Sequence, residues 1–156
     1  MDGIFLGRSK RPPKDPANAV LSFLYTILTT KIAQFMGGQA FDPYVGFLHS
    51  LEYGRLSLAC DLVEPLRSAF CDRIGVKLFN QHRMHFQEDF EERDGGVYMK
   101  RTSIPTLLKI YNSELNKDRN YGFFQGSFEE LLIYFADWLR GCITDKTVRR
   151  LVDERE

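Results

Sequence analysis

Residues 15–38 read DPANAVLSFLYTILTTKIAQFMGG, and this stretch decides the fold. Asp15 followed by Pro16 is typical of a helix start, because aspartate caps a first turn and proline is tolerated at its first position. Gly37 and Gly38 predict the end of the same helix. Between these signals, apolar side chains recur at helical spacing: Val20, Phe23, Leu24, Ile27, Leu28 and Ile32.

Residues 1–15 are predicted to form a basic, extended arm in front of this helix. The prolines fix φ and keep the residues before them out of the helical region. The basic side chains of the arm could neutralise DNA phosphates, although a solvated linker explains them equally well. They are Arg8, Lys10, Arg11 and Lys14.

The next segments also favour helices. We expect a second helix with Ser57 as its cap, running toward Asn80 and bending at Pro65. Residues 103–115 predict a third, with a proline in its first turn. Residues 86–96 are acidic and indicate a loop or a short helical turn.

The remaining segments complete an all-α prediction. A short extended segment is expected near Val97. Ser127 and Glu130 form a capping-box pair that opens another helix, which Gly141 is expected to close. From Thr144 the alternating charges predict a marginal terminal helix. Residues 16–156 are thus expected to form one domain of five or six helices.

Composition favours one soluble domain: of 156 residues, 44% are apolar and 27% charged. No run approaches the roughly 18 consecutive apolar residues of a membrane span, and no signal peptide is apparent, so we expect a cytoplasmic protein without a membrane segment. The three cysteines lack CxxC spacing and are expected to be reduced, mostly buried thiols. With 21 basic and 21 acidic residues, any DNA site must be local.

Asp61 and Glu64 are three apart on a predicted helix, so both carboxylates would lie on one face and could share a divalent cation. The same spacing is common on solvated helix faces. His49 is open to two interpretations as well, as a packing residue or as a ligand. Together, one histidine and two carboxylates suit Mn²⁺ or Mg²⁺ better than structural zinc.

Other chemical motifs have less support. His82 and His85 are also three apart, but they lie in a polar stretch without a carboxylate motif and are predicted to be surface residues. The sequence contains no glycine-rich phosphate loop and no GxSxG elbow, so nucleotide binding and acyl transfer are not indicated.

Three ordered strings resemble one known family: RSKRPPKDPANAVLSFLYTIL at 8–28, FDPYVGFLH at 41–49 and GRLSLACDLVEPLR at 54–67. They are similar to the C-terminal domain of the Cas-one (Cas1) family, the integrases of CRISPR spacer acquisition. The similarity continues through FNQHRMHFQEDFEERDGGVYM at 79–99 and fades after about Leu115. The resemblance implies a helical catalytic domain.

The resemblance also implies a function. Family members are Mn²⁺- or Mg²⁺-dependent DNA nucleases and integrases that dimerise, and a Cas-two (Cas2) dimer bridges two of them while a spacer duplex is joined into the CRISPR repeat. Carried across, the catalytic and metal residues are His49, Asp61 and Glu64. Residues expected to hold the DNA backbone are Arg8, Arg11, Arg55 and Arg67, although ion pairing with Asp61 or Glu64 would also explain the last two.

One departure from the family pattern limits the expected activity. The first metal-binding glutamate of the family lies upstream of the basic arm, and the N-terminal β domain precedes it; the sequence contains neither. We therefore expect the catalytic part of a split or truncated integrase that is inactive until an upstream segment supplies the glutamate. The alternatives are a non-catalytic DNA- or protein-binding remnant and a fragment that only assembles with its parent protein, which predicts exposed apolar patches.

Overall fold

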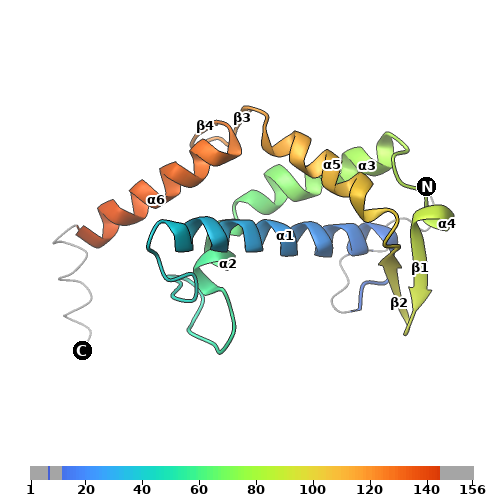
Figure 1. The fold of residues 1–156 in the computed structure, drawn as a ribbon, viewed down its shortest axis with the longest axis horizontal. Helices are drawn as coiled ribbons and strands as arrows, with labels where there is room; N and C mark the ends of the chain where they lie inside the picture. The colour runs from blue at the N-terminus through green and yellow to red at the C-terminus, as the bar shows by residue number, and fades with distance from the viewer. Residues whose placement is uncertain (1–6, 8–11, 145–156) are drawn as a thin grey trace.

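Helices dominate the fold, as a computed structural model of residue 7 and residues 12–144 shows (Figure 1). This part of the chain contains six α-helices, one π-helical segment and two small antiparallel hairpins. The predicted helical class is confirmed. Most of the predicted basic arm, including Arg8 and Arg11, lies outside the described residues.

The helix α1 (Pro16–Gly38) has the predicted ends. The Asp15 carboxylate accepts a hydrogen bond from the Asn18 backbone N–H at 2.7 Å, which confirms the cap. The helix is also long and apolar enough to cross a membrane, a test that core helices of soluble proteins pass too. Here it packs against α2, η1, α3, α6 and β2, and these contacts account for its apolar side chains.

The predicted second helix has the expected extent and the expected disruption at Pro65, but it is not continuous and its predicted cap is wrong. The chain instead forms α2 (Ser57–Val63), the π-helical η1 (Arg67–Asp72) and α3 (Arg73–Asn80). Pro65 lies in the break, where it lacks the N–H that a continuous helix needs. Leu56 precedes the first turn, while the Ser57 hydroxyl bonds to the Ser50 carbonyl rather than capping the helix.

The extended segment near Val97 belongs to a hairpin rather than standing alone. After the short α4 (Phe86–Asp89), strand β1 (Phe90–Arg93) pairs with β2 (Gly96–Met99). Asp94 and Gly95 connect them with φ of 51° and 70°, which the type I′ hairpin turn requires. The Val97 N–H donates to the Pro13 carbonyl at 2.8 Å, so the end of the arm packs on this hairpin.

The last helices meet at a second, very short hairpin. Helix α5 (Ile104–Leu115) confirms the predicted third helix and is followed by β3 (Arg119–Asn120), β4 (Gln125–Gly126) and α6 (Phe128–Thr144). The capping box is confirmed, because the Ser127 N–H donates to Glu130 at 2.8 Å. Helix α6 continues through Gly141, so the predicted stop there is wrong. The helix expected after Thr144 lies outside the described residues.

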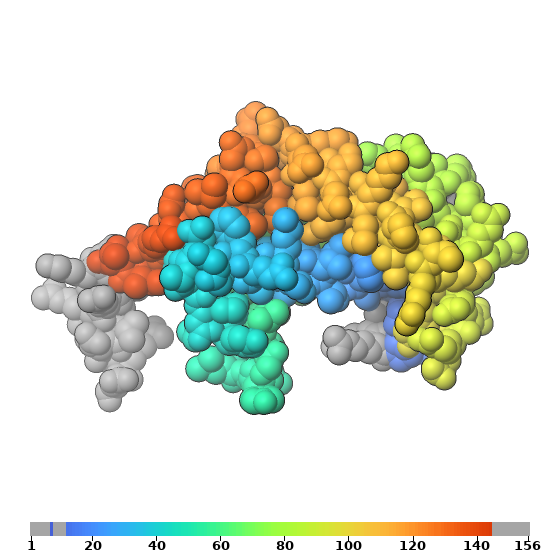
Figure 2. All heavy atoms as spheres, viewed as in Figure 1, coloured from blue at the N-terminus to red at the C-terminus, as the bar shows by residue number. Residues whose placement is uncertain are grey.

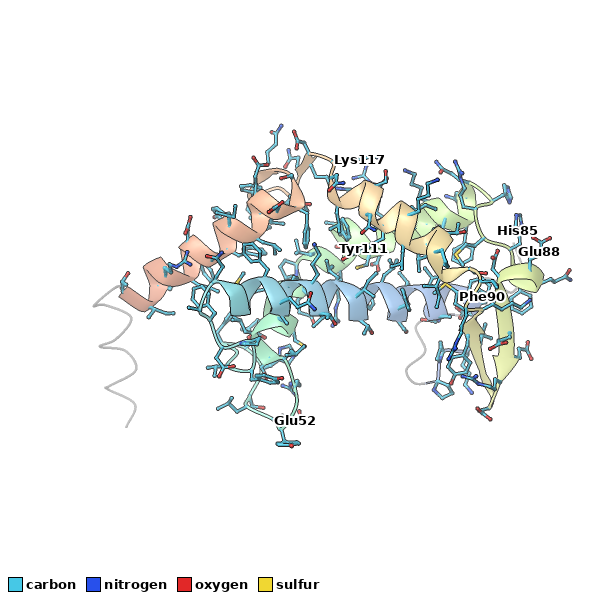
Figure 3. The ribbon with its side chains drawn as sticks, in the orientation of Figure 1. Glu52, His85, Glu88, Phe90, Tyr111 and Lys117 are labelled. Carbon is cyan, nitrogen blue, oxygen red and sulfur yellow. The ribbon has the colours of Figure 1, made fainter. Side chains whose placement is uncertain are left out.

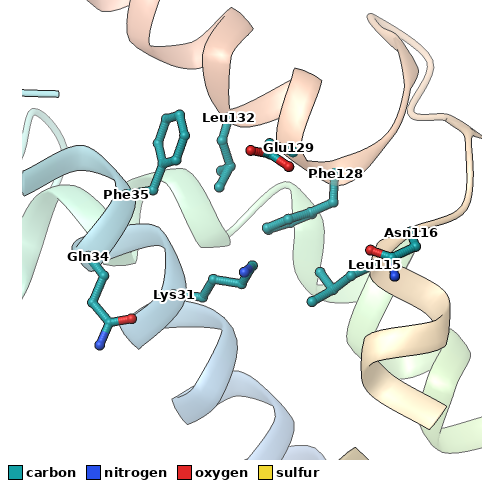
Figure 4. Close-up of a pocket in the computed structure, with 8 residues that line it drawn as sticks. All are labelled: Lys31, Gln34, Phe35, Leu115, Asn116, Phe128, Glu129 and Leu132. Carbon is teal, nitrogen blue, oxygen red and sulfur yellow. The ribbon is translucent and has the colours of Figure 1, made fainter. Parts of the chain in front are cut away.

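Aromatic side chains join the later helices in the core. Phe70 of η1 lies 5.6 Å from Tyr111 of α5 and 5.4 Å from Phe128 of α6, measured between ring centroids. A cavity of about 360 Å³ lies beside this cluster, between α1, the end of α5 and the start of α6 (Figure 4). Lys31, Asn116 and Glu129 give part of its lining a polar character.

Residues 41–56 connect α1 to α2 without helix or strand, and we call them the connector. With α2 the connector forms a lobe that projects from the body of the molecule (Figure 2). Helices α5 and α6 lie on the other side of α1 (Figure 1). The lobe carries His49 and Asp61, and Glu64 follows directly after α2.

Candidate active site

Two hydrogen bonds to carbonyl groups of the connector hold it against the start of α2. The Leu58 N–H donates to the Pro43 carbonyl at 3.1 Å, and the Ser57 hydroxyl donates to the Ser50 carbonyl at 3.1 Å. The segment between these contacts contains Gly46-Phe47-Leu48-His49. It is therefore placed directly over the side of α2 that carries Asp61.

Asp61 binds this segment through its whole carboxylate. One oxygen, Oδ2, accepts from the N–H groups of Phe47 at 2.6 Å and Leu48 at 2.9 Å. The other, Oδ1, accepts from the His49 N–H at 3.2 Å and contacts Nδ1 of the His49 ring. Successive backbone N–H groups form a concavity suited to an anion, and here the anion is a side chain of the same protein.

Gly46 permits this close approach. A Cβ atom at position 46 would lie 2.6 Å from Asp61 Oδ2 and 2.8 Å from the Ser57 Cβ. Both distances are shorter than carbon atoms tolerate, so any side chain would push the connector away from α2. The glycine of the GFLH motif is thus explained by packing against the carboxylate.

The environment of Asp61 determines which nitrogen of His49 carries a proton. Burial raises the pKa of Asp61, but hydrogen bonds from Leu48, the His49 ring, Phe47 and the His49 backbone outweigh burial and lower the pKa below its ordinary value. An ionised carboxylate accepts hydrogen bonds only, so His49 must donate from Nδ1. In the neutral ring this leaves Nε2 with a lone pair, the arrangement found in metal-binding histidines backed by a carboxylate.

Glu64 differs from Asp61 in its surroundings. It lies one residue beyond α2, one helical turn after Asp61, and its side chain is 41% exposed whereas that of Asp61 is fully buried. Its carboxylate pairs with Arg67 at 3.0 Å. The guanidinium of Arg67 lies over the Tyr25 ring, 5.1 Å from its centroid. Glu64 is therefore accessible and held beside a basic side chain.

The three residues predicted as ligands are not clustered as three. Within residues 12–144, no group of three or more His, Cys, Asp or Glu side chains is close enough to hold a metal ion. The structure brings His49 and Asp61 into contact, but the Asp61 oxygens are already engaged by four groups. The donor chemistry fits a hard cation only in part, through His49 Nε2 and the exposed Glu64.

Arg55 and Arg67, the two predicted DNA-contact residues that the structure describes, each have a carboxylate partner. Arg67 pairs with Glu64, as its alternative interpretation required, whereas Arg55 pairs with Glu52 rather than with Asp61 or Glu64. His82 and His85 are exposed, as predicted, and their rings stack 6.2 Å apart. No disulfide joins the three cysteines, of which only Cys71 is fully buried.

The connector also exposes large apolar side chains. Leu48 and Leu51 are 73% and 72% exposed, and Tyr53 is completely exposed. Phe47 packs edge-on against Trp138 of α6 at 6.1 Å between centroids, which ties the connector to the last helix. An exposed apolar surface of this kind was expected if the chain packs against further protein.

Sequence comparison gives a consistent family match. The family model described as CRISPR associated protein Cas1 matches residues 2–113. The CRISPR-associated endonuclease Cas1 3 of Thermus thermophilus is 40% identical over 110 residues, which cover 70% of this chain and 33% of that protein. The CRISPR-associated endonuclease Cas1 2 of Rhodospirillum rubrum is 41% identical over 127 residues, covering 81% and 37%.

Solved structures agree with these relatives. A CAS1 protein from Thermotoga maritima matches with a TM-score of 0.77 and 26% identity, covering 90% of this chain and 44% of that one. A casposase bound to integration product shares the fold alone, with a TM-score of 0.76, 24% identity, and coverage of 92% and 42%. The chain thus spans about a third of the two curated relatives and less than half of these structures.

Proposed function

The chain belongs to the CRISPR-associated Cas1 family, and from that premise we propose that it is the metal-site part of a DNA endonuclease and integrase of CRISPR adaptation. The observation that carries the proposal is the contact between His49 and Asp61, which directs a histidine lone pair away from a buried carboxylate. Glu64 lies one turn further along. The proposed substrates are a spacer DNA duplex and the CRISPR repeat.

In this proposal His49 and Glu64 hold a divalent cation, Mn²⁺ or Mg²⁺, and Asp61 holds His49. Such a cation stabilises the charge on an attacked phosphodiester and lowers the pKa of the attacking hydroxyl. The chain's own contribution is orientation: the buried carboxylate fixes the ring and its tautomer, and it also holds the connector backbone that carries the ring. Two ligands are too few for tight binding, so a glutamate from an upstream segment is proposed to complete the site.

The proposed partners follow from the family. Two copies of the complete protein would dimerise through the N-terminal domain of the family, and a Cas2 dimer would bridge two such pairs. Arg67, beside Glu64, and Arg55, on the connector, are proposed to hold DNA backbone near the cation; Arg8 and Arg11 have the same proposed role. Such a protein would act on DNA in the cytoplasm.

Strand joining in the presence of the upstream half tests the proposal. We expect Mn²⁺-dependent joining of a duplex 3′ end when that half is added, and a loss of at least about a hundredfold with Glu64→Ala or His49→Ala. The matched controls are Glu88→Ala and His82→Ala, exposed residues away from the lobe. Full activity in the Glu64→Ala and His49→Ala variants would exclude the assigned ligands.

A non-catalytic DNA-binding remnant is the second candidate function. The Asp61 carboxylate favours it, because both of its oxygens are already engaged by the connector rather than turned toward a cation. DNA binding that survives both chelation and His49→Ala, without strand joining by any reassembled pair, is the result expected from a remnant.

A further inference from the structure

Glu114 is a second buried carboxylate, and basic side chains gather around it on the side of α1 opposite the lobe. Glu114 of α5 is only 6% exposed, and its Oε1 accepts from Lys77 and Lys117, each at 2.7 Å. Its Oε2 accepts from Arg119 of β3. Three cations thus surround one anion, and the cluster keeps an excess of positive charge.

This excess lines two adjoining cavities. One, of about 500 Å³, is bordered by Arg73, Lys77, Lys117 and Arg119, with Glu114 and Asp118 as its acids. The other, of about 400 Å³, shares Lys77 and Glu114 and adds Arg83 and Lys109. Because the whole chain carries as many acids as bases, six cations against two carboxylates are a local concentration.

The side chains around the larger cavity indicate an anion partner rather than a small organic ligand or a protein. Small-molecule sites are mostly apolar, and stable protein interfaces have an apolar centre. The larger cavity is instead lined wholly by polar and charged residues among those described. Solvated phosphate groups are the ligands that such a surface fits.

The same lining favours double-stranded over single-stranded nucleic acid. Proteins that bind single strands stack the bases on aromatic side chains. Among the described residues that line the two cavities, none is aromatic. Contacts from this surface would therefore reach phosphates only, which a duplex presents on its outside.

We propose that the basic cavities between α3, α5 and β3 form a second DNA site, which binds the phosphate backbone of a duplex independently of any metal. We call it the rear basic surface. Lys117 marks it in Figure 3, at the edge of the molecule opposite Glu52, which lies on the connector. The inference rests on the proposed function for the identity of the nucleic acid. It does not depend on which residues bind the metal ion in the active site.

Binding of the intact chain to a short fluorescent DNA duplex of arbitrary sequence, with chelator present, tests the surface. The variant Arg83→Gln, Lys109→Gln, Lys117→Gln removes three exposed cations and leaves Lys77 and Arg119 on Glu114. We expect on the order of tenfold weaker binding at low salt and a salt slope reduced by up to about 0.9 for each phosphate that the surface no longer neutralises. Unchanged affinity and slope would overturn the proposal.

Two further variants test whether a loss of DNA binding depends on the position of the removed cations rather than on the net charge of the protein or on misfolding. Lys31→Gln, Arg93→Gln, Arg140→Gln removes the same charge elsewhere and is expected to bind nearly as the unmodified chain does. Arg83→Lys, Lys109→Arg, Lys117→Arg keeps the charge and is expected to bind normally. An equal loss of DNA affinity in the Lys31→Gln, Arg93→Gln, Arg140→Gln variant would count against a backbone site. So would an Arg83→Gln, Lys109→Gln, Lys117→Gln variant that no longer binds poly-glutamate, an anionic polypeptide, but still binds DNA.

The outcomes distinguish this inference from the proposed function. If the Arg83→Gln, Lys109→Gln, Lys117→Gln variant binds DNA normally while Glu64→Ala abolishes strand joining, only the proposal of the rear basic surface fails. If the glutamine triple weakens binding but no reassembled protein joins strands, the rear site stands and the integrase assignment fails.

Discussion

Asp61 and Glu114 are both buried carboxylates, but they are satisfied in opposite ways. Asp61 accepts from three consecutive backbone N–H groups and one histidine ring of the connector. Glu114 accepts from two lysines and an arginine on long side chains, the lysines being partly exposed. The first carboxylate fixes a segment of backbone, whereas the second gathers side-chain charges.

The difference indicates different tasks. A carboxylate held by backbone donors fixes positions closely, as the metal-binding role proposed for His49 would require. A carboxylate held by three cations leaves those cations with donors to spare, since lysine has three and arginine five. We therefore infer that the Asp61 region fixes the geometry of the proposed site. The Glu114 region is proposed to make adjustable contacts with an extended anion.

The largest expected effect comes from removing Asp61. Asp61→Ala leaves three backbone donors without their acceptor, at about 1–3 kcal/mol each before relaxation, so we expect a loss of roughly 4 kcal/mol in the free energy of unfolding. Asp61→Asn should be nearly as damaging, because its amide NH₂ would face N–H groups. Urea unfolding measures both. Asp137→Ala, which breaks an exposed pair with Arg140, should change stability by less than about 1 kcal/mol.

Removing the charge of Glu114 should cost less. Breaking a buried ion pair costs about 3–5 kcal/mol, but Lys77 and Lys117 are 35% and 51% exposed, so we expect about 2 kcal/mol for Glu114→Gln. Salt screens the repulsion among the released cations, so this cost should shrink as salt increases, whereas that of Asp61→Ala should not. Equal salt dependence of the two variants in urea unfolding would remove the distinction between the regions.

Local signals made much of the fold predictable. The Asp15-Pro16 start of α1 and the Ser127–Glu130 box of α6 depend on residues within one turn, so sequence alone places them. The Asp94-Gly95 turn was equally local, but the acidic composition around it favoured a loop. The π-helical η1 was not predictable, because Pro65 indicates a disruption without specifying the hydrogen-bond pattern that follows.

The membership of the site stays a prediction, and its geometry was not predictable. Motif spacing and the family resemblance proposed His49, Asp61 and Glu64 as one set, yet they could not show that the connector folds back and uses the Asp61 oxygens. That depends on a close approach at Gly46, which becomes visible only in three dimensions. The Glu114 cluster was missed entirely, since its members come from α3, α5 and β3, with Lys77 and Glu114 separated by 37 positions.

Gly46→Ala tests the geometric role of the connector with a single methyl group. The added carbon meets Asp61 Oδ2 at 2.6 Å, so we expect a loss of roughly 1–2 kcal/mol in stability and a larger proportional loss of metal-dependent joining. Gly37→Ala is the control, because nothing lies within 4 Å of its added Cβ and alanine favours a helix. If Gly46→Ala joined strands at the normal rate, the tight contact between connector and carboxylate would have no part in positioning His49.

Acid titration separates the contribution of charge from that of backbone geometry. Burial raises the pKa of Glu114, but hydrogen bonds from Lys117 and Lys77 and the charges of Lys77 and Arg119 lower it from 4.5 to about 2. A carboxyl whose pKa is depressed in the folded state stabilises fully above its unfolded pKa, and this contribution is lost as the pH falls through the folded value. The stability difference between the unmodified chain and Glu114→Gln should thus be constant above pH 4.5 and shrink toward about pH 2. Urea unfolding at a series of pH values measures it, and a difference that persisted to the acid end would show that Glu114 acts through packing rather than through its charge.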